Sequence, residues 1–164
     1  MLNNQEVLAL ATEAHKGQYR DNNDPYITHP MRVASRAVAL AKLNNFDLDV
    51  TYQVAILHDV LEDTKETPTS LVALGVDPRV VDILYFLNKH NYESYARMIY
   101  AIGSLSAPFI TVVVKHSDLT DNLSDRTNPP EYYLTKSWKQ RKDKYELSKM
   151  YLEQVSQRYI VFKE

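Results

Sequence analysis

The sequence contains no cysteine, which excludes a disulfide framework and any thiolate metal site. A metal site in this chain would have to use histidine, aspartate and glutamate, which suit harder or borderline ions such as Mn, Mg, Fe or Zn. Only 3 glycines and 7 prolines interrupt the 164 residues. The spacing between these breakers favours helices over short strands.

Long apolar runs and a strong net charge are also missing. No apolar run reaches the roughly 18 residues of a membrane span, and residues 1–6 lack the basic region of a signal peptide. The formal net charge of −2 provides no basic field that would attract nucleic acid. We therefore expect one cytoplasmic domain over residues 1–164, with neither a membrane nor nucleic acid as a partner. The sequence does not indicate an oligomeric state.

Hydrophobic residues recur every three to four positions along most of the chain, which predicts a series of helices. The expected helices cover residues 2–19, 31–43, 80–87, 91–101 and 132–159, with a further one that begins near Asp47 and carries His58, and a short one that is capped by Thr69. The exception is the segment 110–115, whose β-branched residues locally favour a strand.

The segment Ala55–Thr64 is an apolar helical run that contains His58, Asp59, Glu62 and Asp63. Residues three and four apart share a helix face, so His58 should lie beside Glu62, and Asp59 beside Asp63. Burying such groups is costly unless they contact one another, a cation or water. His58 and Asp59 can bind one metal ion, which leaves the other two for a metal-bound water. A capped helix end with a solvated acidic tip explains this segment equally well.

A second polar stripe follows the apolar segment 110–115. Its members recur at helical intervals and are Asp118, Asp121, Asn122 and Asp125. Carbonyl caps or solvent would also explain this stripe, but two such stripes in one small chain favour a shared site. His29 stands at an expected helix start, where it can be held toward that site, although a lone histidine is more often a structural hydrogen-bonding residue.

Four segments occur in a specific order: HKGQYR at 15–20, PYITHP at 25–30, LHDVLEDT at 57–64, and VKHSD at 114–118 followed by Asn122 and Leu123. This combination resembles the hydrolase domain of the RelA/SpoT family, within the HD superfamily, and most of all its small stand-alone alarmone hydrolases. The resemblance implies an all-α fold with a metal site between helices. It also implies a Mn(II)-dependent 3′-pyrophosphohydrolase that acts on guanosine tetra- and pentaphosphate.

The resemblance also implies individual roles. The metal ligands would be His29, His58, Asp59 and Asp118. Glu62 and Asp63 would orient and deprotonate the attacking water, Arg20 would pack against the guanine, Asn122 would contact the ribose, and Tyr145 aligns more loosely. Lys16, Arg20, Arg141 and Lys142 are candidates to neutralise phosphates, although a solvated face also explains the last two. Asp21, Leu119, Asp121 and Asp125 depart from the family pattern near the substrate.

The leading hypothesis is hydrolysis of ppGpp to GDP and pyrophosphate. One alternative is an HD phosphohydrolase that acts on another nucleotide, such as NADPH. Another is a nucleotide-binding module without turnover, against which the complete set of four metal ligands argues.

Overall fold

The computed structural model describes residues 1–104, 106–124 and 135–162, which form helices and no strand beyond one isolated bridge. In order, the elements are α1 (Asn4–Ala14), α2 (Thr28–Leu43), α3 (Leu48–Leu57), α4 (Val60–Asp63), α5 (Pro68–Ala73), α6 (Pro78–Leu87), the 3₁₀ helix η1 (Lys89–Asn91), α7 (Tyr95–Gly103), α8 (Phe109–Ser124) and α9 (Lys136–Ser156). The expected all-α fold is confirmed. No helix within the described ranges is both long enough and apolar enough to cross a bilayer.

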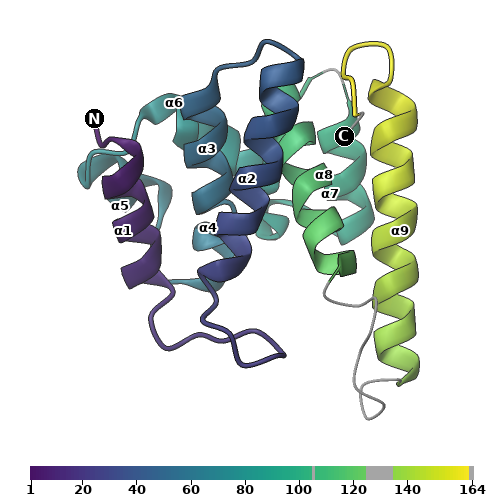
Figure 1. Cartoon of the computed structure of the whole chain (residues 1–164), viewed down its shortest axis with the longest axis horizontal. Helices are drawn as coiled ribbons and strands as arrows, with labels where there is room; N and C mark the ends of the chain where they lie inside the picture. Colours follow the sequence, from purple (N-terminus) through teal and green to yellow (C-terminus); the bar gives the residue numbers. More distant parts are fainter. Residues whose placement is uncertain (105, 125–134, 163–164) are drawn as a thin grey trace.

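Helix α2 packs against both α3 and α8, and these three helices form the frame of the site. Helix α9 lies against α7 and α8, whereas α1 covers α3 at the opposite end (Figure 1). The frame encloses fully buried side chains such as Val33 of α2, Leu57 of α3 and Leu119 of α8. Burying a side chain of this size stabilises the fold by about 1.5–3 kcal/mol. The core thus fixes the three segments that carry the ionisable residues.

The helix that was expected to carry both His58 and Glu62 is interrupted at His58. Helix α3 ends at Leu57, His58 is its C-cap, and α4 begins at Val60. The Nδ1 of His58 donates to the carbonyl oxygen of Ala55 at 2.7 Å, so the side chain satisfies a carbonyl that the helix end leaves without a partner. The prediction that His58 and Glu62 share one helix face is therefore wrong.

The strand predicted for residues 110–115 is also wrong, because the segment belongs to α8. Val112, Val113 and Val114 are at most 2% exposed. A valine in a helix costs roughly 0.5 kcal/mol relative to alanine, whereas burying its side chain contributes about 1.5 kcal/mol or more. Packing against neighbouring helices therefore outweighs the local preference.

Helix α1 is shorter than expected and ends at Ala14 rather than near Tyr19. Gly17 then adopts a positive φ of 80°, which glycine tolerates best. The chain turns into an antiparallel bridge between Tyr19 and Pro25. This turn brings Arg20 back to the site.

Two further helix starts differ from expectation. Thr67, rather than Thr69, caps α5 through the backbone N–H of Ser70. Helix α7 begins at Tyr95, after a Ser94 cap, because residues 89–91 form the separate 3₁₀ turn. The expected last helix is confirmed over α9, while its first residues, 132–134, and the candidate Asp125 lie outside the described ranges.

Candidate active site

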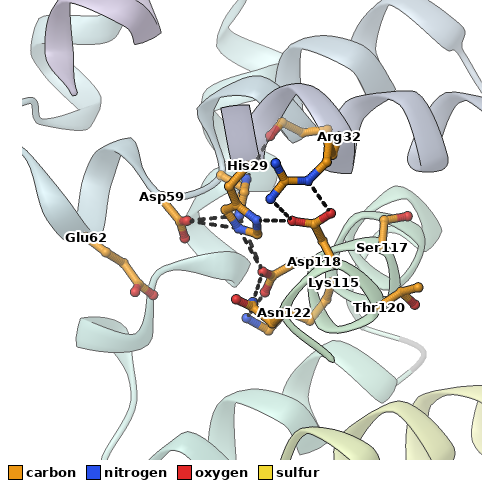
Figure 2. Close-up of polar contacts among 12 residues, drawn as sticks. His29, Arg32, Asp59, Glu62, Lys115, Ser117, Asp118, Thr120 and Asn122 are labelled. Carbon is orange, nitrogen blue, oxygen red and sulfur yellow. Dashed lines mark hydrogen bonds and ion pairs between the residues drawn. The ribbon is translucent and has the colours of Figure 1, made fainter. Parts of the chain in front are cut away.

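Four ionisable side chains from three parts of the chain converge in the interior: His29 from α2, His58 and Asp59 from the α3–α4 junction, and Asp118 from α8. One ligand atom each of His29, His58 and Asp59 lies within 4.8 Å of the others. The Oδ1 of Asp118 lies 3.2 Å from His29 Nε2 and 3.7 Å from His58 Nε2. Figure 2 shows Asp59 to the left of His29 and Asp118 below it. The structure thus brings together all four residues expected to be metal ligands.

Hydrogen bonds on the outer side of both imidazoles determine which nitrogen faces the centre. His29 Nδ1 lies 2.7 Å from Oδ2 of Asp121, and His58 Nδ1 lies 2.7 Å from the Ala55 carbonyl oxygen. Both partners only accept, so each Nδ1 carries the proton. In the neutral ring, each Nε2 then presents a lone pair to the carboxylates of Asp59 and Asp118.

This arrangement needs a cation at its centre. His58 is 3% exposed, and its Nε2 is a buried atom without a hydrogen-bond partner among the described residues, although it lies 3.0 Å from Asp59 Oδ2. Two lone pairs that face two carboxylates repel one another unless a proton or a metal ion lies between them. A borderline divalent ion prefers this mixture of nitrogen and oxygen ligands, so the residues fit a metal.

When no metal is bound, the charges of the four groups shift one another's pKa values. Burial disfavours a charged imidazole, but the neighbouring carboxylates outweigh it and raise the pKa of both His29 and His58. Burial alone would raise the carboxyl pKa values. His58 nevertheless lowers the pKa of Asp59, and Lys115 does the same for Asp118. Both carboxylates therefore stay ionised, and they stabilise a positive charge at the centre.

Asp121 holds His29 from behind. It is 0% exposed and accepts from Arg32 Nε and Nη2 at 2.8 and 2.9 Å, and from Arg36 Nη1 at 2.6 Å. Burial works against the charge, but the bonds from His29 and Arg32 lower the pKa of Asp121 well below its usual range. An ionised carboxylate on the outer nitrogen of a metal-bound histidine fixes its orientation and raises its basicity. Asp121 was expected near the substrate, whereas it lies behind the imidazole of His29.

Two further side chains hold the carboxylates of the centre. The hydroxyl of Tyr26 donates to Asp59 Oδ2 at 2.6 Å and lies 3.4 Å from Asp63 Oδ2. Burial, followed by the charge of Asp59, raises the pKa of Tyr26, so the phenol stays protonated. The ammonium of Lys115 lies 2.7 Å from Asp118 Oδ2.

Glu62 and Asp63 lie on α4 at the edge of this centre. The side chain of Glu62 is 11% exposed, and its Oε2 lies 3.0 Å from Lys89 Nζ. The backbone N–H of Lys89 also donates to Glu62 Oε1. Figure 2 shows Glu62 apart from the cluster that surrounds His29. Glu62 is thus a carboxylate held beside the four ligands rather than among them.

A pocket of about 270 Å³ opens over the centre. Its lining residues are Arg20, Tyr26, His29, Asp59, Glu62, Asp63, Lys89, Tyr95, Met98, Lys115, Asp118, Asn122, Lys144 and Tyr145. The four lysine and arginine side chains in this list balance its four carboxylates. A bound divalent ion would therefore leave two net positive charges, which suits an anionic phosphate group.

Three of the predicted substrate-binding residues line this pocket: Arg20, Asn122 and Tyr145. The Nη2 of Arg20 donates to Asn122 Oδ1 at 3.0 Å, and Asn122 in turn donates to Asp118. These contacts link the predicted base and sugar positions to the metal centre.

The other three predicted phosphate-binding residues lie outside the lining of the pocket. The side chain of Lys16 is 74% exposed and pairs with Glu13 at 3.1 Å. Lys142 lies 3.7 Å from Glu146 on the outer surface of α9, and its neighbour Arg141 is also exposed. Lys144, two positions further on, lines the pocket instead, and its Nζ lies 4.3 Å from the ring centroid of Tyr95.

Four residues that line the pocket were not predicted to be functional: Tyr26, Lys89, Lys115 and Tyr95. Tyr26 and Lys115 fall inside the quoted motifs, so their position next to His29 and Asp118 was a usable signal. Lys89 and Tyr95 come from a part of the chain without a motif, and only the packing of α6, η1 and α7 brings them to the pocket.

Comparison with known proteins adds the family context. The HD domain family matches residues 26–128, a range that contains all four expected metal ligands. A guanosine-3′,5′-bis(diphosphate) 3′-pyrophosphohydrolase of Borreliella burgdorferi is 30% identical over 77% of this chain and 19% of its own length. The enzyme of the same name from Haemophilus influenzae is 34% identical over 70% of this chain and 17% of its own length. The chain thus matches less than a fifth of these relatives.

A solved structure shares the fold. It is that of a metazoan ortholog of SpoT described as hydrolysing ppGpp, and it superposes with a TM-score of 0.71 over 94% of both chains at 19% identity. At this identity the similarity establishes the helical architecture.

Proposed function

The chain belongs to the HD domain family, and on that premise we propose that it is a metal-dependent phosphohydrolase that removes the 3′-pyrophosphate of (p)ppGpp. The observation that carries the proposal is the pair of Nε2 lone pairs, from His29 and His58, aimed at the buried carboxylate of Asp118 and the partly buried carboxylate of Asp59. The names of the similar pyrophosphohydrolases support the choice of substrate. We further propose Mn(II) as the ion, residues 1–164 as one domain, and the cytoplasm as the location.

In the proposed hydrolysis, the four ligand residues bind the metal and Glu62 activates the attacking water. His29, His58, Asp59 and Asp118 would hold a divalent ion, which would supply hydroxide at neutral pH by lowering the pKa of bound water toward about 7 and would polarise a phosphoryl oxygen. Glu62 orients the attacking water and accepts its proton, with Asp63 beside it. Lys89 keeps Glu62 in place through its two contacts.

Cationic and aromatic residues of the pocket bind the nucleotide. Lys144 and Lys115 neutralise the phosphates, while Arg20 stacks on the guanine through its planar guanidinium. Asn122 contacts the ribose, and its Oδ1 accepts the hydrogen bond from Arg20. Water adds to the 3′-diphosphate, the bond between that group and the ribose oxygen breaks, and GDP and pyrophosphate leave. We therefore expect GTP, which has no 3′-diphosphate, to stay intact.

The test of substrate is product analysis with the Mn-loaded protein and a panel of ppGpp, pppGpp, GTP and NADPH. Conversion of ppGpp to GDP and pyrophosphate, with GTP untouched, is the expected result. Cleavage of NADPH with survival of ppGpp would support a phosphohydrolase but would rule out ppGpp as its substrate. Tight binding of ppGpp without any product would instead indicate a nucleotide-binding module.

The test of the metal site is the metal content of His58→Ala and Asp118→Ala. Both variants should lose bound Mn and activity while their circular dichroism stays helical. His116→Gln, a buried histidine on the helix that also carries Asp118, is the matched control and should keep its metal. Full metal content in both alanine variants would show that the four residues do not form one site.

A further inference from the structure

A second concave surface lies on the side of α2 and α8 away from the catalytic pocket. It is a groove of about 640 Å³, lined by Ser35, Arg36, Ala39, Leu40, Lys42, Leu43, His116, Ser117, Thr120 and Phe162. Figure 2 shows Ser117 and Thr120 on the side of α8 that faces away from Asp59 and Glu62. The volume is within the range of 300–1,000 Å³ typical of small-molecule sites.

The groove combines an apolar floor with cationic side chains. Leu40, Leu43 and Phe162 provide apolar surface, whereas none of the ten lining residues is acidic. The chain as a whole carries a net charge of −2, so a groove whose lining has cationic but no acidic residues departs from the average surface. Its ligand should therefore combine a negative charge with an apolar body.

Two cations of the groove are placed for such a ligand. Lys42 is exposed on the last turn of α2 and has no ionic partner in the described part of the chain. Arg36, whose side chain is 34% exposed, contacts Asp121 through Nη1 alone, which leaves the other edge of its guanidinium for a ligand. Since Asp121 also contacts His29, this arginine joins the groove to the back of the metal centre.

We propose that this groove is a second ligand site, which binds a small anion with an apolar body: the charge contacts Lys42 and Arg36, and the body covers Leu40, Leu43 and Phe162. The proposal does not depend on the proposed function, because binding at the groove can be measured without turnover.

The experiment is a fluorescence titration of the full chain with 8-anilinonaphthalene-1-sulfonate and with its uncharged analogue N-phenyl-1-naphthylamine. Ala39→Trp fills the groove from an exposed position on α2, and Lys42→Gln removes a charge without touching Asp121. Ala73→Trp and Lys65→Gln make the same changes on exposed positions outside both sites. Circular dichroism of each variant verifies the helical fold.

We expect saturable binding of one sulfonate per chain, loss of this binding in Ala39→Trp, and several-fold weaker binding in Lys42→Gln. The uncharged analogue should bind more weakly and should not respond to Lys42→Gln, while both control variants should match the wild type. Equal sulfonate affinity in the wild type, Ala39→Trp and Lys42→Gln would overturn the proposal. Equal affinity of the two probes would do the same, because the groove would then not select an anion.

Discussion

His29 and Asp121 form a buried hydrogen bond of 2.7 Å between residues that lie 92 positions apart in the sequence. Its donor is Nδ1 of the imidazole, so the bond fixes which nitrogen faces Asp59 and Asp118. Arg32 and Arg36 hold the carboxylate from the other side. A carboxylate held in this way fixes the orientation of a metal-binding imidazole.

Asp121→Asn should weaken Mn binding by roughly 10- to 100-fold, the usual effect of losing a partner of a ligating histidine. The amide keeps the size of the side chain but removes the charge, and its NH₂ group faces donors of Arg32 or His29. Calorimetric titration of the metal-free protein with Mn measures the change. Asp77→Asn alters another ion-paired aspartate, at the start of α6, and should leave Mn affinity unchanged. Equal affinities of the wild type and Asp121→Asn would show that Asp121 has only a structural role.

The pKa values of the two histidines predict how pH affects the stabilisation by Mn. The folded pKa of His58 is raised above its unfolded value of 6.5. In the metal-free protein, its positive charge therefore stabilises the fold below that value, and this contribution disappears as pH rises through the folded pKa. Metal binding requires the neutral ring, so protons compete with Mn at low pH.

We therefore expect the difference in melting temperature between Mn-saturated and chelator-treated protein to grow as pH rises from about 6 to about 8. Differential scanning fluorimetry at constant ionic strength measures it. The acidic partners have lowered pKa values and stay ionised over this range, so they do not reverse the trend. A difference that is constant with pH would contradict the assignment of the two histidines as ligands.

The convergence of the four ligand residues followed from sequence because each lies in a short motif with characteristic neighbours. The role of Asp121 did not follow, since it depends on the contact between α2 and α8 and on two arginines of α2. The break at His58 was equally hidden, because the local pattern of apolar residues continues through it. At the break, the imidazole of His58 donates a hydrogen bond to the carbonyl oxygen of Ala55, a contact that the apolar pattern does not encode.

The choice among the basic residues of α9 depends on the rotation of that helix. Successive residues of a helix point about 100° apart, so only some members of a basic cluster can face the pocket. The sequence of α9 does not indicate which face packs inward, because its apolar stripe is weak and polar residues dominate both faces. Packing against α7 and α8 turns Lys144 and Tyr145 to the pocket and leaves Lys142 beside Glu146 at the surface.

Lys144→Gln should therefore raise KM for ppGpp by about tenfold or more, as for the loss of a charge-assisted hydrogen bond, with a smaller effect on kcat. Lys142→Gln, two positions away on the same helix, is the matched control and should leave both constants unchanged. Steady-state kinetics of the two Mn-loaded variants provide the measurement. The opposite result, with Lys142 sensitive and Lys144 neutral, would support the phosphate role proposed for Arg141 and Lys142 and refute that of Lys144.

Glu62→Gln separates catalysis from binding. The amide keeps the size of the side chain and can still accept the backbone N–H of Lys89, but it cannot take a proton from water. The variant should keep its Mn and its affinity for ppGpp, while kcat falls by roughly 100-fold or more, as for loss of a general base. Metal analysis, calorimetric nucleotide titration and single-turnover kinetics give the three quantities.

Glu66→Gln is the matched control for this substitution, because Glu66 accepts a bond from Ser70 and lies outside the lining of the pocket. It should retain wild-type kcat. An unchanged kcat in Glu62→Gln would remove Glu62 from the proton transfer and transfer the role to Asp63, whose Oδ2 lies 3.4 Å from the Tyr26 hydroxyl. Asp63→Asn would then show the 100-fold loss, whereas under the present assignment it lowers kcat less than Glu62→Gln, because Asp63 only assists.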